Sequence, residues 1–145
     1  MNVKNVRLIN KEESDEIDRL SNEALKLLNL YDESNIIDIL NKMNIFVDNF
    51  IENNDINDNN IEDYAYKLGS LFGNLINAKY EWQWYYIENE KDIFYGVVSQ
   101  KQRACCICHN YFYEILTQKR SNNFKLLFNM IEKEYPKNWY FVLLK

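Results

Sequence analysis

The chain has 145 residues, of which 47% are hydrophobic, so wholesale disorder is excluded and a core can form. The formal net charge is −5, which argues against general nucleic-acid binding because phosphate neutralisation needs a concentrated basic surface. No apolar run approaches the ~20 residues that span a bilayer, and no signal-peptide core is seen, so we expect a cytoplasmic protein with no membrane partner. The length predicts a single domain, 1–145, with a helical N-terminal part (1–52) and an α+β core (60–145).

The N-terminal part is predicted to form two helices, because its apolar residues recur at helical spacing. The first helix follows Asn10, which forms the pattern of a capping box with Glu13. The second begins at Asp32 or Ser34 and ends near Asn53.

A third helix is predicted after Asn60, and its apolar face contains two of the chain's three glycines. Gly69 and Gly73 are four residues apart and therefore share one face of the helix. Glycine within a helix costs about 1 kcal/mol relative to alanine, so close packing is expected at this face. We expect the aromatic strand that follows in the sequence to pack there.

From residue 81 to residue 108 the sequence is rich in aromatic and β-branched residues, which favour strands. Short polar turns divide this stretch into three strands, so it predicts an antiparallel meander. Trp82, Trp84 and Tyr86 alternate along the first strand and therefore share one face. Residues 88–92 form a charged turn.

The last part of the chain contains one ambiguous segment, 110–118, which fits either a helix or a strand. A closing helix begins at Asn122 or Asn123 and runs through Glu134, and residues 139–144 form a final apolar strand. The predicted fold class is therefore α+β, with N-terminal helices followed by an antiparallel β-meander, a C-terminal helix and a final strand.

One cluster could bind a metal or provide a nucleophile, namely Cys105, Cys106, Cys108 and His109. Structural zinc sites usually take their ligands from two separated pairs, and the sequence has no second pair. Adjacent residues on a strand also point to opposite faces, so the four side chains do not converge. We expect buried thiols, with no catalytic residue, metal or cofactor. A cysteine-dependent enzyme or metal site remains as a further hypothesis.

Three motifs and the predicted closing helix occur in an order that resembles a bacterial domain family of unknown function, the DUF3806-like group. The motifs are Leu68-Gly69-Ser70-Leu71-Phe72-Gly73, Trp82-Gln83-Trp84 and Tyr95-Gly96-Val97-Val98-Ser99, and the helix spans 123–131. The resemblance covers roughly residues 60–131. It departs from the family pattern at His109, near which such sequences often carry a proline.

Small acidic domains similar to this one are immunity proteins of bacterial polymorphic toxins, including contact-dependent growth inhibition systems. The resemblance implies a non-catalytic protein that binds a cognate toxin domain, such as a nuclease, and blocks its active site or substrate path. An acidic surface suits a basic nuclease cleft, because complementary fields steer association.

The candidate partner-binding residues form two acidic surfaces with aromatic residues beside them. They are Asp55, Asp58, Glu62 and Asp63; Glu88, Glu90 and Asp92; and Trp82, Trp84 and Tyr85. The alternative function is a small-ligand-binding or regulatory domain that uses the aromatic sheet face as a pocket.

Overall fold

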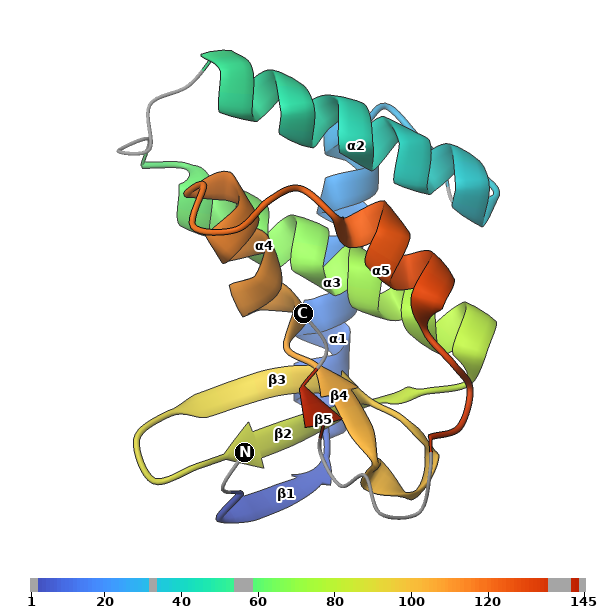
Figure 1. Ribbon diagram of the computed structural model, residues 1–145, viewed down its shortest axis with the longest axis vertical. Helices are drawn as coiled ribbons and strands as arrows, with labels where there is room; N and C mark the ends of the chain where they lie inside the picture. Colours follow the sequence, from blue (N-terminus) through green and yellow to red (C-terminus); the bar gives the residue numbers. More distant parts are fainter. Residues whose placement is uncertain (1–2, 32–33, 54–58, 136–141, 144–145) are drawn as a thin grey trace.

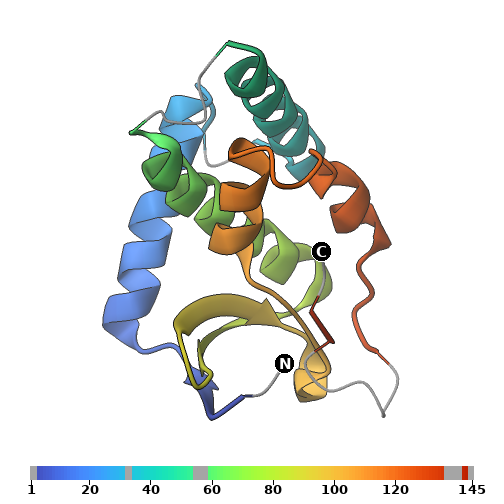
Figure 2. The ribbon, with the colours of Figure 1, turned by 60° about the vertical axis from the view of Figure 1, so that its left-hand side comes forward.

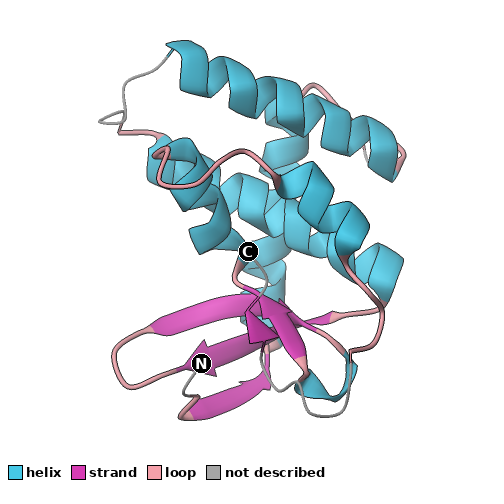
Figure 3. Ribbon diagram, viewed as in Figure 1, coloured by secondary structure: helices cyan, strands magenta, loops and turns pink. Residues whose placement is uncertain are grey.

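The computed structural model describes residues 3–31, 34–53, 59–135 and 142–143. Within these ranges there are five α-helices and a five-stranded sheet. The sheet lies at one end of the molecule and most of the helices at the other, while the first helix runs from the helical end down to the sheet (Figures 1 and 3). The predicted α+β class is confirmed. None of the helices in the described ranges combines the length and the apolar character needed to cross a bilayer.

The first three helices lie close to where the sequence predicts them: α1 (Lys11–Leu27), α2 (Ile36–Asn53) and α3 (Ile61–Tyr80). The predicted capping box is present at α1. The Glu13 backbone N–H donates to Asn10 Oδ1, and the Asn10 N–H donates to Glu13 Oε1, each at 2.9 Å.

Helix α2 begins later than predicted, at Ile36. Ser34 lies before the helix, and Asp32 is outside the described residues. Instead, Asn35 accepts a hydrogen bond from the backbone N–H of Asp38 at 2.8 Å, which satisfies one of the free N–H groups in the first turn.

The predicted meander is present as β2 (Gln83–Glu88), β3 (Ile93–Val98) and β4 (Ala104–Cys106), with a short 3-10 turn (Gln100–Gln102) before β4. Two further strands extend it. Strand β1 (Asn5–Leu8), which the sequence did not predict, pairs antiparallel with β2, and β5 (Val142–Leu143) pairs parallel with β4. The sheet order is β1-β2-β3-β4-β5.

The chain after β4 differs from the prediction. The third strand ends at Cys106 rather than at residue 108, because Cys108 already begins α4 (Cys108–Leu116). The ambiguous segment 110–118 is therefore mainly helical. Helix α5 (Phe124–Met130) is shorter than predicted and stops before Ile131, which is extended and buried.

Helix α3 crosses the middle of the molecule, with α1 behind it and α4 and α5 in front in Figure 1, and α2 at the top of Figures 1 and 2. Phe72 of α3 is fully buried and its ring contacts those of Phe112, Phe124 and Phe128. The apolar face of α3 is thus the centre of the core.

The two glycines of α3 allow close approach, as the sequence predicts, but to different elements. A Cβ on Gly73 would overlap the indole of Trp84 on β2, the expected aromatic strand. A Cβ on Gly69 would lie 2.8 Å from the Cα of His109 on α4. The prediction is confirmed for Gly73, whereas at Gly69 the close neighbour is α4, which the sequence did not identify as a helix.

Candidate functional site

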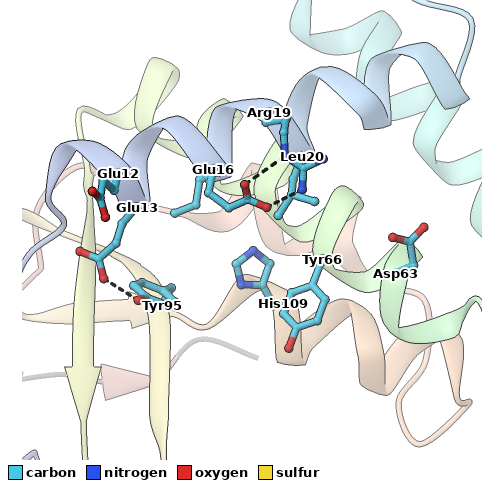
Figure 4. Close-up of a pocket in the computed structure, with 10 residues that line it drawn as sticks. Glu12, Glu13, Glu16, Arg19, Leu20, Asp63, Tyr66, Tyr95 and His109 are labelled. Atoms are coloured by element: carbon cyan, nitrogen blue, oxygen red, sulfur yellow. Dashed lines mark hydrogen bonds and ion pairs between the residues drawn. The ribbon is translucent and has the colours of Figure 1, made fainter.

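An open pocket of about 530 Å³ lies between α1, α3, the first turn of α4 and β3 (Figure 4). A smaller pocket of about 260 Å³ adjoins it, since Tyr66 and His109 line both. We call these two adjacent pockets together the α1–α3 groove. Its lining is mainly apolar in the larger pocket, with Ile17 and Leu20 of α1 facing Tyr66 and Tyr95.

His109 lies at the centre of the groove lining, between Tyr95 and Tyr66 (Figure 4). Its ring stacks on the indole of Trp84, with centroids 5.7 Å apart, and contacts the ring of Tyr66 at 5.3 Å. Only 8% of the residue is exposed. Burial lowers the pKa of His109 to about 4, because desolvation disfavours the charged imidazolium. The ring is therefore neutral at pH 7.

The position of the proton on His109 follows from its contact with Ser70. The Ser70 Oγ lies 2.9 Å from His109 Nε2 and has no other hydrogen-bond partner in the described chain. A buried hydroxyl proton without an acceptor is costly, so Ser70 donates to Nε2 and the imidazole proton sits on Nδ1. No described residue accepts a bond from Nδ1, which leaves one donor on a ring that lines the groove.

The Ser70–His109 contact has the distance of a nucleophile–base pair, but Ser70 is 0% exposed. A substrate carbonyl cannot reach its Oγ without a rearrangement of α3 and α4. No described carboxylate contacts His109 to orient it as the third member of a triad. The pair therefore fixes the imidazole rather than activating the serine.

Glu13 closes the end of the groove near the sheet. It forms an ion pair with Arg7 on β1 at 2.8 Å and accepts a hydrogen bond from the Tyr95 hydroxyl at 2.5 Å. Hydrogen bonding from Arg7 is the main cause that lowers the pKa of Glu13 to about 2. Arg7 also lies over the Tyr86 ring, 4.3 Å from its centroid. Glu13 thus ties α1 to the sheet.

The other carboxylates at the groove differ in whether they are neutralised. Glu16 pairs with Arg19 at 2.5 Å, and Asp63 pairs with Lys67 at 2.8 Å. Glu12 lines the larger pocket and Glu62 the smaller one. Neither has an ion-pair partner among the described residues, so these two exposed carboxylates carry uncompensated negative charge.

Of the first predicted acidic surface, the structure places Glu62 and Asp63 on the first turn of α3, where both are exposed and border the groove. Asp55 and Asp58 lie outside the described residues. Two of the four residues in this predicted acidic surface therefore line the groove.

The predicted aromatic anchors lie elsewhere. Trp82 and Trp84 are only 3% and 7% exposed. Their Nε1 groups donate to the Glu132 carbonyl at 3.3 Å and to Asn74 Oδ1 at 2.9 Å. Both indoles pack in the core, so the prediction that they anchor a partner at the surface is corrected. Tyr85 is half-buried and packs on the other sheet cluster, with Ile87 and Val98.

The second predicted acidic surface is the β2–β3 turn, and none of its residues lines the groove. Glu90 and Asp92 are exposed. Asn89 Oδ1 accepts the backbone N–H groups of Lys91 and Asp92, which holds the turn in shape. Glu88 is half-buried and lies 3.9 Å from Lys4.

The three cysteines are all 0% exposed. Cys105 packs on one sheet face, whereas Cys106 and Cys108 belong to the main core. Burial raises the pKa of Cys105 to about 12 and raises that of Cys108 well above its usual range, so both remain thiols. Within the part of the chain that the structure describes, no group of three His, Cys, Asp or Glu side chains is placed to hold a metal.

Tyr66 and Tyr95 were not predicted as site residues, and His109 was considered only together with the cysteines, because three different elements bring the groove residues together. The sequence offered one signal, Gly69, whose missing side chain lets α4 approach α3 and position His109. Comparison with protein-family models, curated proteins and solved structures gives no significant match to this chain. The geometry of the groove and the charge of the chain are therefore the features that bear on its function.

Proposed function

We propose that this chain is a non-catalytic immunity protein, which binds a cognate bacterial toxin domain in the cytoplasm and blocks its active site or substrate path. A nuclease is one class of toxin that suits this mode, because its substrate cleft must be basic to hold phosphate. The immunity protein would then bind the toxin rather than nucleic acid or a membrane.

The observation that carries this proposal is the α1–α3 groove. Its two pockets contain Glu12 and Glu62, which have no ion-pair partner among the described residues, on a chain of net charge −5. Acidic fields of this kind accelerate association with a basic protein and disfavour acidic partners. The aromatic side chains in the groove add contact area of the type that dominates protein interfaces.

The reactive side chains of the described chain support binding rather than covalent catalysis. The cysteines are buried thiols, and Ser70 is inaccessible behind His109. A nucleophile must be both activated and reachable to attack a substrate. None of these groups meets both conditions.

The test is to mix the purified chain with the purified product of the toxin gene that neighbours its own gene. We expect a stoichiometric complex, loss of toxin activity in the mixture, and survival of cells that express both proteins. Absence of a complex at micromolar concentrations, together with no protection of cells, would refute the proposal.

A small-ligand-binding domain is the second candidate, and the volume of the larger pocket favours it. Ligand pockets are typically ~300–1,000 Å³, and this pocket holds about 530 Å³. Its place is the α1–α3 groove rather than the Trp82–Trp84 face. Thermal shift measurements against a metabolite panel discriminate the two functions, because a toxin-binding protein is stabilised by its protein partner alone.

A further inference from the structure

We infer that the α1–α3 groove receives a basic segment of the partner protein, with one Lys or Arg side chain in the larger pocket and a second basic residue near Glu62. The inference rests on the proposed function and specifies the chemistry of the partner. The charge, shape and hydrogen-bonding capacity of the groove all favour such a segment.

The charges of the groove favour a cation at each end. Glu12 at the larger pocket and Glu62 at the smaller one have no ion-pair partner in the described chain. The remaining carboxylates of the larger pocket are neutralised by Arg7, Arg19 and Lys67. Glu12 lines one pocket and Glu62 the other, and Tyr66 and His109 line both. A segment with two basic residues can therefore neutralise both carboxylates at once.

The lining between these charges suits the stems of long basic side chains. Lys and Arg carry an aliphatic stem that packs on apolar surface while the charged end reaches a carboxylate. Ile17, Leu20 and Tyr66 provide such a surface in the larger pocket. Tyr66 is 44% exposed, so a guanidinium can also stack on its ring.

His109 offers a donor to the backbone of the same segment. Its Nδ1–H has no acceptor among the described residues, and a peptide carbonyl is an acceptor of the right kind. Because burial lowers the pKa of His109, the ring stays neutral at pH 7 and does not repel a neighbouring cation. An anionic ligand would satisfy Nδ1 but would be repelled by Glu12 and Glu62.

The first experiment measures toxin binding by calorimetry for two charge-reversed variants. Glu12→Lys/Glu62→Lys changes the groove, and Asp38→Lys/Glu52→Lys makes the same change of net charge on exposed positions of α2. We expect the groove variant to weaken binding by at least about tenfold more than the α2 variant. Equal affinities of the two variants would overturn the inference. The milder Glu12→Gln/Glu62→Gln variant tests the same charges if the reversed variant fails to fold.

The second experiment uses probes that do not depend on the toxin. Capped peptides with two arginines separated by one, two or three leucines are titrated into the chain, and the NMR signal of its single histidine is followed. We expect a saturable shift that the Glu12→Gln/Glu62→Gln variant loses and that matching glutamate peptides do not produce. No shift with any arginine peptide contradicts the inference.

The two experiments separate the inference from the proposed function. If the groove variants bind the toxin as tightly as the α2 variant does, the inference is refuted and the immunity function is unaffected. Arginine peptides that bind in a Glu12- and Glu62-dependent way, with no toxin complex, support the groove chemistry and refute the immunity function.

Discussion

His109 is the only histidine of the chain, so its titration can be followed without ambiguity. Its pKa is lowered to about 4 from the usual 6.5, which means that the unfolded chain takes up a proton earlier than the folded one. Stability is therefore unaffected above pH 7 and falls as the pH drops through 6.5 towards 4. Between pH 7 and pH 5 we expect the free energy of unfolding to decrease by about 2 kcal/mol.

Urea unfolding at pH 7, 6 and 5 measures this decrease. His109→Phe is the control, because without the imidazole the free energy of unfolding should change little over this pH range. The imidazole signals in NMR should report a neutral ring with the proton on Nδ1 at pH 5. A titration midpoint near pH 6.5 in the folded protein would contradict the burial argument, and a neutral ring with its proton on Nε2 would contradict the assigned tautomer.

Gly73 provides a second prediction for a single residue. Helix propensity alone predicts that Gly73→Ala stabilises α3 by about 1 kcal/mol. The added Cβ would overlap the Trp84 indole, however, and overpacking of a core costs about 1–3 kcal/mol. We expect net destabilisation, measured by chemical denaturation.

The Trp84→Leu background is the control for Gly73→Ala. Removing the indole removes the obstacle, so the same substitution should be neutral or stabilising there. A stabilising effect of Gly73→Ala in the wild-type background would show that the indole moves easily.

At the scale of elements, α1 is joined to the sheet through one carboxylate. Glu13 caps its own helix, pairs with Arg7 of β1 and accepts from Tyr95 of β3. Glu16, one turn further along α1, pairs with Arg19 of the same helix, and both are about half exposed. Contacts that join elements and are partly shielded contribute more than exposed pairs within a helix.

We therefore expect Glu13→Gln to lower the free energy of unfolding by about 1–2 kcal/mol, and Glu16→Gln to lower it clearly less. The Glu13 contribution should be present above pH 4.5 and be lost as the pH falls towards 2, because its pKa is lowered in the folded state. Denaturation of the two variants at pH 7 and pH 3 checks both statements. Equal losses at pH 7 would indicate that β1 and β3 are not held through Glu13.

The elements that were predicted well are marked by residues within their own sequence. Helix α1 has its capping box, and α2 and α3 have a long amphipathic periodicity that is typical of helices and not of strands. Strand β1 was missed because its four residues are mostly exposed at the sheet edge, so no hydrophobic alternation marks it. Helix α4 begins one residue after Ile107, with no side-chain cap, and its aromatic residues also suit a strand.

The candidate site was harder to predict because it depends on tertiary packing. The acidic residues Glu62 and Asp63 were identified from local charge, and both border the groove. Trp84 was assigned to a surface because acidic residues flank its strand, although the gap left by Gly73 pointed to a buried indole. His109 acquires its role only where α3 and α4 meet.

At the scale of the whole molecule, the exposed carboxylates of the described residues include Glu12 and Glu62 at the groove and Glu90 and Asp92 at the β2–β3 turn. The groove offers a depression in which a partner side chain can be buried. Glu90 and Asp92 of the turn line neither pocket of the groove. We therefore expect the two regions to act on different steps of binding, since exposed rim charges alter association more than dissociation.

Reversing Glu90 and Asp92 to lysine should slow association with the toxin and flatten its dependence on ionic strength, with little change in the dissociation rate. The groove variant Glu12→Lys/Glu62→Lys should instead raise the dissociation rate as well, because contacts made in the bound state are lost. Stopped-flow mixing at 20 mM and 200 mM salt measures both rates, and Asp38→Lys/Glu52→Lys on α2 corrects for the change in net charge. If the turn variant and the α2 variant associate equally fast at low salt, the turn does not face the partner during encounter, and steering comes from the net charge of the chain alone.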